Sequence, residues 1–443
     1  MRRRPTMLTL ATAVALALPA GGVAAAQAQQ DEPARAQEQQ SSGPEEQSLA
    51  QELSRAVEEA ARQRNGLRAQ AAPGETQAAP AGKEMREALD RAARGLVEDG
   101  AVGVTARVES PGFDWAGSAG TRELDGRAPA QPQDRFRVAS ITKTMVATLV
   151  MQEVEAGTFT LQTPVNEIVP GLFPGRPGVT VEHLLSHRSG AQTATDYVIA
   201  SRMEDPNSWE DFFEAIGQDY TADDYLTVVN ALPWKFEPGT DVNYSNAGYV
   251  ALGVILEEVT GEDLADLLRD RVLRPAGMQH TAYPDEPGTR GPFLVGAAFT
   301  GTPEQGGIGW VSVDRFDPDV FGASGAATST TKDLNKLTEA LIEGELVGPE
   351  TVADMVTPRT VNHEWLPDYG LGVYRLPDPC SEPGQTGWLY GHDGGAYGTV
   401  SLALTSADGS RQVSLGITGR DLTQEVQPYD VAQLLVPMLL ATC

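Results

Sequence analysis

The sequence predicts an α+β fold, in which an antiparallel sheet is flanked by helices and a mostly helical region is inserted between the two halves of the sheet. Three observations predict it. A helical segment and two alternating segments open the folded part, at residues 84–100, 102–110 and 113–120. The region over roughly 158–330 holds helical pieces among many Pro and Gly residues. Strand-like runs then return near the end of the chain, so strands from both ends can meet in one sheet.

Each element follows from its periodicity and from the residues that end it. The helix over 84–100 ends at a glycine, and the two alternating segments form a hairpin around a Ser-Pro-Gly turn. Apolar residues at helical spacing predict a helix over 141–157, which also ends at a glycine. Further helices are expected over 247–261, 264–273 and 428–441, and strands over 387–395, 399–406 and 411–418.

The composition excludes several classes of protein. A chain of 443 residues with 41% hydrophobic and 21% charged residues can bury a large core, so disorder throughout is excluded. The net charge of -28 opposes binding to a phosphate backbone, so a nucleic-acid partner is excluded. Two cysteines and five histidines without a metal-ligand pattern predict neither a structural metal nor a cofactor.

The N-terminal segment has the character of an export signal. Three arginines precede an apolar run that is too short to span a bilayer, and small residues in an A-x-A pattern follow it. We therefore expect a signal peptide over 1–26 and a secreted product, free or associated with the cell wall, without a membrane-spanning segment. An uncleaved anchor is the alternative.

Residues 27–83 are rich in Gln, Glu, Ala and Pro and contain no aromatic residue. Such a composition predicts a disordered tether. Within it Leu49, Leu53 and Val57 recur at four-residue spacing and could form one transient amphipathic helix. The folded domain is accordingly expected over 84–443.

Ser140 and Lys143 form an S-x-x-K tetrad at the start of the helix expected over 141–157. Residues three apart share a helix face, so Lys143 can act as a base for the Ser140 hydroxyl once burial favours its neutral amine. The helix N-terminus also directs backbone N–H groups toward a developing oxyanion. This arrangement is typical of acyl transfer. The alternative is a capping Ser140 with a solvated Lys143.

Two further motifs supply the context that such chemistry needs. Tyr244 and Asn246 stand in a loop just before a helix, where a phenol could relay a proton and a carboxamide could hold a substrate amide. A G-H-D-G-G run at 391–395 lies on an expected strand, where glycines permit close approach of a substrate backbone and His392 could add polarity to the relay. The alternatives are a capped turn and a glycine-rich hairpin with a surface histidine.

The order S-x-x-K, Y-x-N, H-x-G resembles the penicillin-recognising serine hydrolases, in the branch of class C β-lactamases and secreted D-alanyl-D-alanine carboxypeptidases. The stretches DRFRVASITKT, TVEHLLSHRSG, SGAATSTTKDL and YGHDGGAYG are similar to family stretches in family order, and the resemblance covers about 84–443. It implies these roles: nucleophile Ser140, base Lys143, relay Tyr244, substrate clamp Asn246, third-motif residue His392, and an oxyanion hole of the Ser140 and Gly395 N–H groups.

The resemblance also implies a disulfide between Cys380 and Cys443, which an oxidising compartment would maintain. Two buried free thiols are the alternative. The bridge would pin the final helix to the sheet.

The leaving-group subsite departs from the family pattern. The resemblance places Asp393, Gly394, Tyr397, Tyr374 and Arg375 around it. Asp393 stands where the carboxypeptidases usually carry Thr or Ser, and Gly395 replaces a second hydroxyl-bearing residue. Tyr374 stands where they carry a carboxylate-binding Arg. An ionised Asp393 would repel a substrate carboxylate, unless it pairs with Arg375 or another cation.

The leading hypothesis is a secreted serine hydrolase of D-alanyl-D-alanine carboxypeptidase type that acts on peptidoglycan stem peptides and is acylated by β-lactams. The alternatives are an esterase, a D-aminopeptidase or a β-lactamase-like hydrolase with the same machinery. A non-catalytic cell-wall binding protein is a third possibility, although binding alone does not require a nucleophile together with a proton relay.

Overall fold

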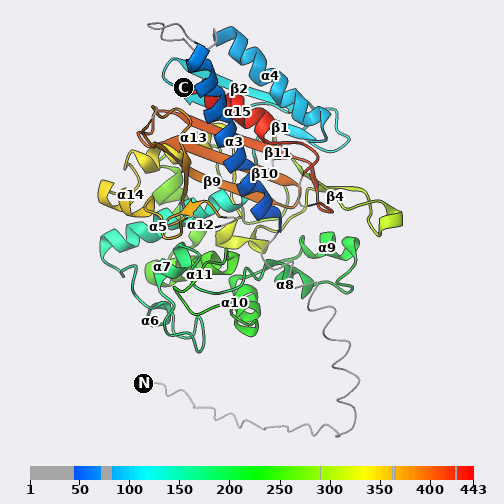
Figure 1. Cartoon of the computed structure of the whole chain (residues 1–443). Helices are drawn as coiled ribbons and strands as arrows, with labels where there is room; N and C mark the ends of the chain where they lie inside the picture. The colour runs from blue at the N-terminus through cyan, green and yellow to red at the C-terminus, as the bar shows by residue number, and fades with distance from the viewer. Residues whose placement is uncertain are drawn as a thin grey trace, which may run out of the picture. The chain divides into compact units, whose positions relative to one another are not determined.

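The computed structural model describes residues 44–70, 82–289, 291–361, 363, 366–382, 384–424 and 427–443. The expected signal peptide over 1–26 and parts of the expected tether, 27–43 and 71–81, lie outside the described residues. Within the described ranges the chain folds around one large antiparallel sheet with helices on both faces (Figure 1). The α+β prediction is confirmed.

The large sheet is built from the two ends of the domain, as expected. Among the described residues it has seven strands in the order β2-β1-β11-β10-β9-β8-β7. The register pairs Val104 with Ile417 and Gly395 with Val400, which joins the N-terminal hairpin to the C-terminal meander. The strand bounds are β1 (Gly103–Ser110), β2 (Phe113–Gly120), β7 (Asp368–Tyr369), β8 (Tyr374–Pro377), β9 (Trp388–Ala396), β10 (Thr399–Ser406) and β11 (Gln412–Thr418).

The helices fall into two groups by position along the chain. Those at the chain ends are α3 (Pro44–Gln70), α4 (Gly82–Glu98) and α15 (Ala432–Ala441). The others are α5 (Thr142–Ala156), α6 (Val165–Ile168), α7 (Val181–Leu185), α8 (Thr195–Ala200), α9 (Trp209–Ala215), α10 (Ala222–Ala231), α11 (Asn246–Thr260), α12 (Leu264–Leu268), α13 (Thr331–Ile342) and α14 (Pro349–Met355). Short 3-10 turns are η1 (Ala139–Ile141), η3 (Pro303–Gln305), η4 (Pro318–Val320) and η5 (Gly322–Ser324), and η2 (Arg269–Leu273) is a π turn.

The inserted region is less purely helical than expected. It carries β4 (Gly296–Phe299) and β5 (Trp310–Val313), which join β12 (Arg420–Asp421) in a small separate sheet. The short strands β3 (Phe136–Arg137) and β6 (Thr328–Ser329) pair with each other beside η1. The sequence did not predict the β4–β5 hairpin, because each strand has only four residues and glycines flank them, so the alternation of apolar and polar residues is too short to recognise.

Two apolar clusters lie on the two faces of the large sheet. One face is covered by α3, α4 and α15, whose apolar side chains meet those of β1, β10 and β11. The other face packs on α5 and α13, and this second cluster continues into the inserted helical region. The nucleophile helix α5 therefore lies between the sheet and the helical region. None of the helices in the described part of the chain combines the length and the apolar character that crossing a membrane requires.

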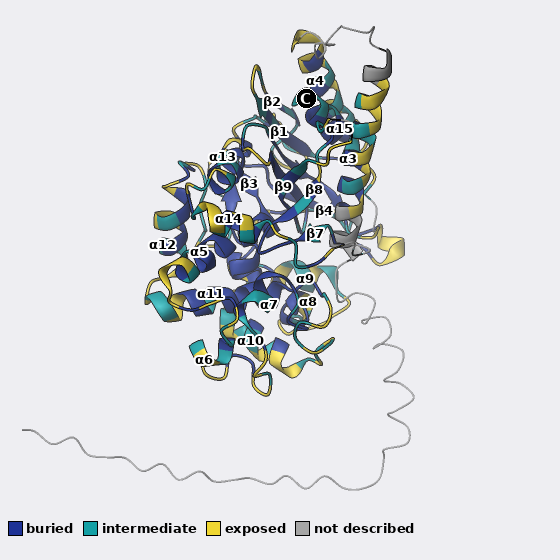
Figure 2. Ribbon diagram, turned by 60° about the vertical axis from the view of Figure 1, so that its left-hand side comes forward, coloured by how far each residue is buried: buried dark blue, intermediate teal, exposed yellow. Residues whose placement is uncertain are grey.

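The disordered tether is wrong for residues 44–70, which form the 27-residue helix α3. The spacing that suggested a transient helix instead makes a packed one: Leu49, Leu53 and Val57 are buried. Helix α3 contacts α15, β8 and β9, so it lies across the sheet with its exposed side chains on the outer side (Figures 1 and 2). The sequence could not show this, because the apolar surface that α3 covers is formed more than 300 residues later in the chain.

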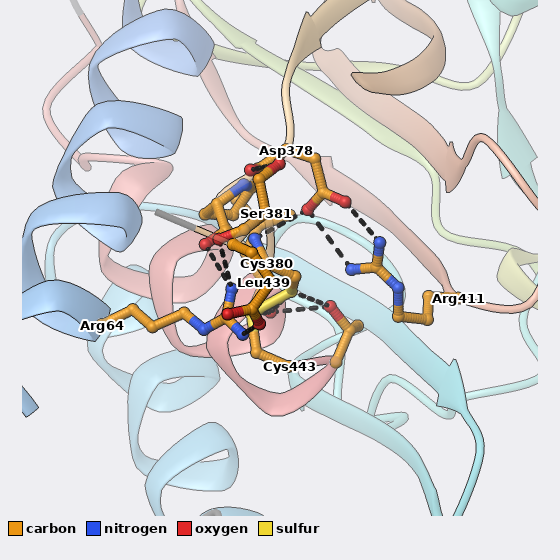
Figure 3. The surroundings of a disulfide bond; sticks show 10 residues. Arg64, Asp378, Cys380, Ser381, Arg411, Leu439 and Cys443 are labelled. Carbon is orange, nitrogen blue, oxygen red and sulfur yellow. Dashed lines mark hydrogen bonds and ion pairs between the residues drawn. A yellow bond between two sulfur atoms is a disulfide. The ribbon is translucent and has the colours of Figure 1, made fainter. Parts of the chain in front are cut away.

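Cys380 and Cys443 are joined by a disulfide, as the resemblance implied. The bridge ties the end of α15 to the loop before β9, and Arg64 of α3 donates to the backbone oxygens of Pro379 and Ser381 beside it (Figure 3). The disulfide and the Arg64 hydrogen bonds thus connect α15 and α3 to the loop before β9, and both helices pack on the same face of the sheet.

We expect removal of this disulfide to lower the free energy of unfolding by about 4 kcal/mol, because the bridge closes a long loop in the unfolded chain. Urea titration of the wild type and of the Cys380→Ser/Cys443→Ser variant measures the difference. The reductant-treated wild type should match the variant, and the variant itself should not respond to reductant. Equal unfolding free energies for the oxidised wild type and the variant would contradict this expectation.

Candidate active site

Ser140 lies in η1, at the junction between strand β3 and helix α5. The preceding Ala139 has φ +45°, a left-handed conformation that costs free energy in a residue other than glycine. Strand β9 passes so close that a Cβ on Gly394 would lie 2.3 Å from the Val138 oxygen and 2.9 Å from the Ser140 nitrogen. Only glycine fits there. Gly394, expected to bind substrate, therefore also permits the strand to approach the backbone of the serine.

Lys143 is fully buried one turn after the serine, and its side-chain nitrogen has a defined set of neighbours. Its Nζ is 2.9 Å from Ser140 Oγ, 2.7 Å from Asn246 Oδ1 and 2.9 Å from the carbonyl oxygen of Ser324. A solvated lysine, the alternative considered from sequence, is excluded. The amine instead connects the start of α5 with the first residue of α11 and with η5.

Tyr244 reaches this lysine from the loop before α11, and Asn246 reaches it as the first residue of that helix. The Ser245 side chain caps α11 by accepting from the Gly248 N–H, which fixes the turn that carries both residues. Lys143 Nζ lies 4.6 Å from the centre of the Tyr244 ring, and Asn246 Nδ2 donates to Thr195 Oγ1 at 2.9 Å. An alcohol, an amine, a phenol ring and a carboxamide from separate segments thus come together.

His392 is buried on β9, and its two nitrogens are both engaged. Nδ1 contacts the backbone oxygen of Asp393, which can only accept, so Nδ1 carries the proton. Burial first, and then the Lys143 charge, lower the pKa of His392 to about 3, so the ring is neutral and Nε2 accepts from the Tyr369 hydroxyl at 2.9 Å. The surface histidine considered from sequence is excluded, and the direct hydrogen-bonding partner of His392 is Tyr369.

The Asp393 carboxyl lies beside the Tyr374 hydroxyl, where burial and hydrogen bonding act on its pKa in opposite directions. Burial raises the pKa of Asp393 to about 6, against smaller opposing effects of its own backbone N–H, the Tyr374 hydroxyl and the Lys143 charge. The residue keeps part of its surface exposed. With this pKa the carboxyl is mostly neutral at pH 5 and mostly ionised at pH 8.

Arg375 forms its ion pair with Asp368 and not with Asp393. Its guanidinium pairs with Asp368 at 3.0 Å and lies 3.8 Å over the Trp388 ring. Neighbouring side chains on a strand point to opposite faces, so Tyr374 and Arg375 cannot both face Asp393. The suggested Asp393–Arg375 pair is wrong. Tyr397 lies just beyond β9, where its hydroxyl donates to Asp196 at 3.1 Å and its ring packs against Phe212.

A different cation, Arg420, lies next to strand β9. Arg420 is buried, and its Nη1 is 3.2 Å from the point where a Cβ on Gly395 would lie. The same nitrogen donates to the Ala396 oxygen at 3.1 Å. Burial, followed by the Asp430 charge, raises the pKa of Glu52 on α3 to about 7, while Arg420 acts in the opposite direction. Helix α3 therefore contributes a titrating group that interacts electrostatically with Arg420.

His187 was not assigned a role from sequence, yet it contacts the core of the site. Its ring centre lies 4.1 Å from that of Tyr244 and 4.8 Å from that of Tyr369, and its Nδ1 accepts from the Ser245 N–H. Burial first, and then the Lys143 charge, hold the pKa of His187 well below its usual value. This neutral ring packs against Tyr244 and binds the backbone of the next residue, Ser245. The stretch TVEHLLSHRSG resembled the family, but no spacing in it connects residue 187 with residue 244.

The arrangement suits covalent catalysis by an activated serine. Ser140 is hydrogen-bonded to a buried amine, and its backbone nitrogen faces a strand whose N–H groups can share the binding of an oxyanion. Across the described residues, no three His, Cys, Asp or Glu side chains come together as a metal site would require.

Comparison with known proteins identifies the relatives of this chain. Residues 88–410 match the family model described as Beta-lactamase. The chain is 29% identical to penicillin-binding protein 4 of Amycolatopsis lactamdurans, over 64% of this chain and 71% of that protein. It is also 29% identical to esterase EstB of Burkholderia gladioli, over 70% and 84% respectively. A D-stereospecific amidohydrolase from Streptomyces sp. superposes with a TM-score of 0.67 at 26% identity, covering 79% of this chain and 97% of that one.

Proposed function

The chain belongs to the beta-lactamase family of serine hydrolases, and we propose that it is a secreted member that cleaves amides or esters of D-amino acids through an acyl-enzyme on Ser140. The observation that carries this proposal is the buried Lys143 amine, which contacts the Ser140 hydroxyl and the Asn246 carboxamide together. The similarity to a D-stereospecific amidohydrolase and to an esterase supports the substrate class. The disulfide supports an oxidising, extracellular location.

The proposed reaction has two steps. Ser140 Oγ attacks the substrate carbonyl while its proton moves to Lys143, and the N–H groups of Ser140 and Gly395 hold the resulting oxyanion. Tyr244 passes its hydroxyl proton to the leaving amine or alcohol, which departs, and Tyr244 regains a proton from Lys143. Water then attacks the acyl-enzyme while Lys143 and Tyr244 take up its proton, and they return that proton to Ser140 Oγ as the acid product leaves. Asn246 holds the substrate amide and orients Lys143 through its Oδ1.

The Asp393 carboxyl favours a leaving group without a negative charge. At pH 8 a substrate carboxylate next to an ionised Asp393 would be repelled, and the resemblance to carboxypeptidases fails at this subsite. A neutral amide, an ester or an amine meets no such repulsion. Arg375 is paired with Asp368, so its charge does not offset that of Asp393.

A second candidate function, D-alanyl-D-alanine carboxypeptidase activity on peptidoglycan stem peptides with acylation by β-lactams, is favoured by one observation. Arg420 Nη1 lies against Gly395, where the carboxypeptidases carry a hydroxyl-bearing residue. A substrate carboxylate at this position would gain a buried cation. The similarity to a penicillin-binding protein supports this candidate too.

Four substrates distinguish the two candidates: D-alanine amide, a p-nitrophenyl ester, a D-Ala-D-Ala peptide and nitrocefin. We expect the amide and the ester to have the higher kcat/KM at pH 8. A preference for the peptide would establish the carboxypeptidase instead. Inactivity on all four, together with no labelling by a fluorescent penicillin, would contradict both and favour a non-catalytic binding protein.

We expect Asp393→Thr to raise kcat/KM for the D-Ala-D-Ala peptide about tenfold at pH 8. The variant removes the repulsion between the Asp393 carboxylate and the substrate carboxylate, and about 1.4 kcal/mol of repulsion corresponds to a factor of ten in kcat/KM. In the wild type, the ratio of kcat/KM for this peptide to that for its C-terminal amide should fall as pH rises through about 6. The ratio should be constant with pH in Asp393→Thr, while the exposed control Asp114→Thr should behave as the wild type. An unchanged or lower peptide activity in Asp393→Thr would refute the repulsion argument.

A further inference from the structure

Tyr225 of helix α10 is buried behind the Ser140 site, in the inserted helical region. Helix α10 packs against α8 and α11, which carry Thr195 and Asn246 (Figure 1). The Tyr225 hydroxyl contacts Thr195 Oγ1 at 3.0 Å, and the Asn246 carboxamide contacts the same oxygen at 2.9 Å. Asn246 in turn contacts Lys143 at 2.7 Å. A row of hydrogen bonds between buried side chains therefore runs from Tyr225 to the amine beside the nucleophile.

The direction of each hydrogen bond in this row follows from counting protons. The Tyr225 phenol also contacts the backbone oxygen of Val320, which can only accept. Burial, against a smaller effect of the Thr195 hydrogen bond, holds the pKa of Tyr225 well above its usual value, so the phenol keeps its single proton. That proton goes to the Val320 oxygen. The Thr195 hydroxyl then donates to the Tyr225 oxygen, and Thr195 Oγ1 accepts from Asn246 Nδ2.

These directions fix which end of the Asn246 carboxamide faces Lys143. With its nitrogen toward Thr195, its oxygen Oδ1 faces the amine and accepts from it. A carboxamide turned by half a rotation would place Oδ1 against a hydroxyl whose proton is already used for Tyr225. It would also place Nδ2, a donor, against the amine. Tyr225 and Thr195 therefore select one orientation of Asn246.

The selected orientation decides where the lone pair of the Lys143 amine is directed. A neutral amine has two N–H groups and one lone pair. Asn246 Oδ1 and the Ser324 carbonyl oxygen each accept one N–H, so the lone pair is directed at the Ser140 hydroxyl, 2.9 Å away. A turned Asn246 would instead donate to the lone pair and compete with Ser140. The base that takes the serine proton is thus aligned through Asn246.

The other end of the row returns to the same amine through the backbone. Val320 is the last residue of η4, and Ser324 is the last residue of η5. The Ser324 hydroxyl and N–H both donate to the Phe321 oxygen, at 2.6 and 2.9 Å, which holds this turn. Tyr225 thus anchors the segment that supplies the second acceptor for Lys143.

We propose that Tyr225, acting through Thr195, is a positioning residue for the Ser140 reaction, because it orients Asn246 so that Lys143 directs its lone pair at the serine. This role rests on the proposed function, since it concerns the base that activates Ser140. The role needs the proton of the Tyr225 hydroxyl, whereas a structural role would need only the free energy of one buried hydrogen bond.

The rate at which Ser140 reacts with a fluorophosphonate reagent tests the proposal. Ser140 Oγ displaces fluoride from phosphorus, so the rate reports the activation of the serine whatever the true substrate is. With the reagent in excess, a partly unfolded sample lowers the extent of reaction but not its rate constant. We expect Tyr225→Phe to lower the rate constant about tenfold and Thr195→Val about 100-fold, as for displaced catalytic groups. Thr195→Ser keeps a hydroxyl and should stay within about threefold of the wild type.

Tyr220→Phe is the matched control. Tyr220 is also buried, and its hydroxyl donates to the Ala215 oxygen at 3.0 Å. Its loss should lower the melting temperature about as much as Tyr225→Phe does and leave the rate constant unchanged. Equal rate constants for Tyr225→Phe and the wild type, an equal fall in Tyr220→Phe, or a Thr195→Ser variant as slow as Thr195→Val would overturn the proposal.

The fluorophosphonate also separates this proposal from the proposed function. Peptide mapping places the phosphonyl group on Ser140. If the wild type reacts there but hydrolyses none of the four substrates, the substrate class is wrong, while the rate constants of the variants still decide the role of Tyr225. A wild type that does not react at Ser140 would contradict both.

Discussion

Replacing Ser140 with alanine is expected to reduce kcat/KM on the preferred substrate by on the order of 10^5-fold, because the reaction loses its nucleophile while substrate binding and the oxyanion donors remain. The hydroxyl contributes one hydrogen bond to Lys143, so the fold should persist. Steady-state assays with the four substrates, alongside circular dichroism, measure both effects.

The control for this variant is Ser110→Ala, which removes a hydroxyl at the end of β1. Its activity should equal that of the wild type. Activity of Ser140→Ala within tenfold of the wild type would mean that another group performs the attack, and the proposed mechanism would then be wrong.

Lys143→Gln is expected to lower kcat/KM by about 10^3-fold, within the range for loss of a general base. Glutamine retains a donor for Asn246 Oδ1 and the Ser324 oxygen, so the loss should concern proton transfer more than folding. Small primary amines such as methylamine should restore part of the activity, since they can supply the missing base in the space that the shorter side chain leaves.

Lys83→Gln, which changes an exposed lysine on α4, is the matched control and should keep full activity with no response to methylamine. If methylamine leaves Lys143→Gln unchanged while the variant is folded, the lysine serves to position Asn246 and does not act as the base.

The parts of the fold that the sequence predicted are those with local signals. The alternation in β1, β2, β10 and β11 is clear because each strand has a run of seven or eight residues. Ser140 and Lys143 are three residues apart on one helix, so their contact follows from helix geometry alone. Tyr244 and Asn246 were connected to them only through the order of motifs, and their contact with Lys143 depends on how α11 packs against α5.

The parts that the sequence did not predict depend on contacts between distant segments. Helix α3 has a modest apolar stripe, and its burial depends on the surface that α15 and β9 present. The partner of His392 proved to be Tyr369, and the cation near Gly395 proved to be Arg420. No period or motif relates these pairs, because sheet register and the path of the C-terminal segment bring them together.

Acid-quenched reaction of the wild type with a D-alanine p-nitrophenyl ester, followed by peptide mapping in the mass spectrometer, tests the serine mechanism most directly. We expect one D-alanyl group per chain, on the peptide that carries Ser140, and none in Ser140→Ala. Release of nitrophenol without any labelled peptide, or a label on a peptide from elsewhere in the chain, would contradict it.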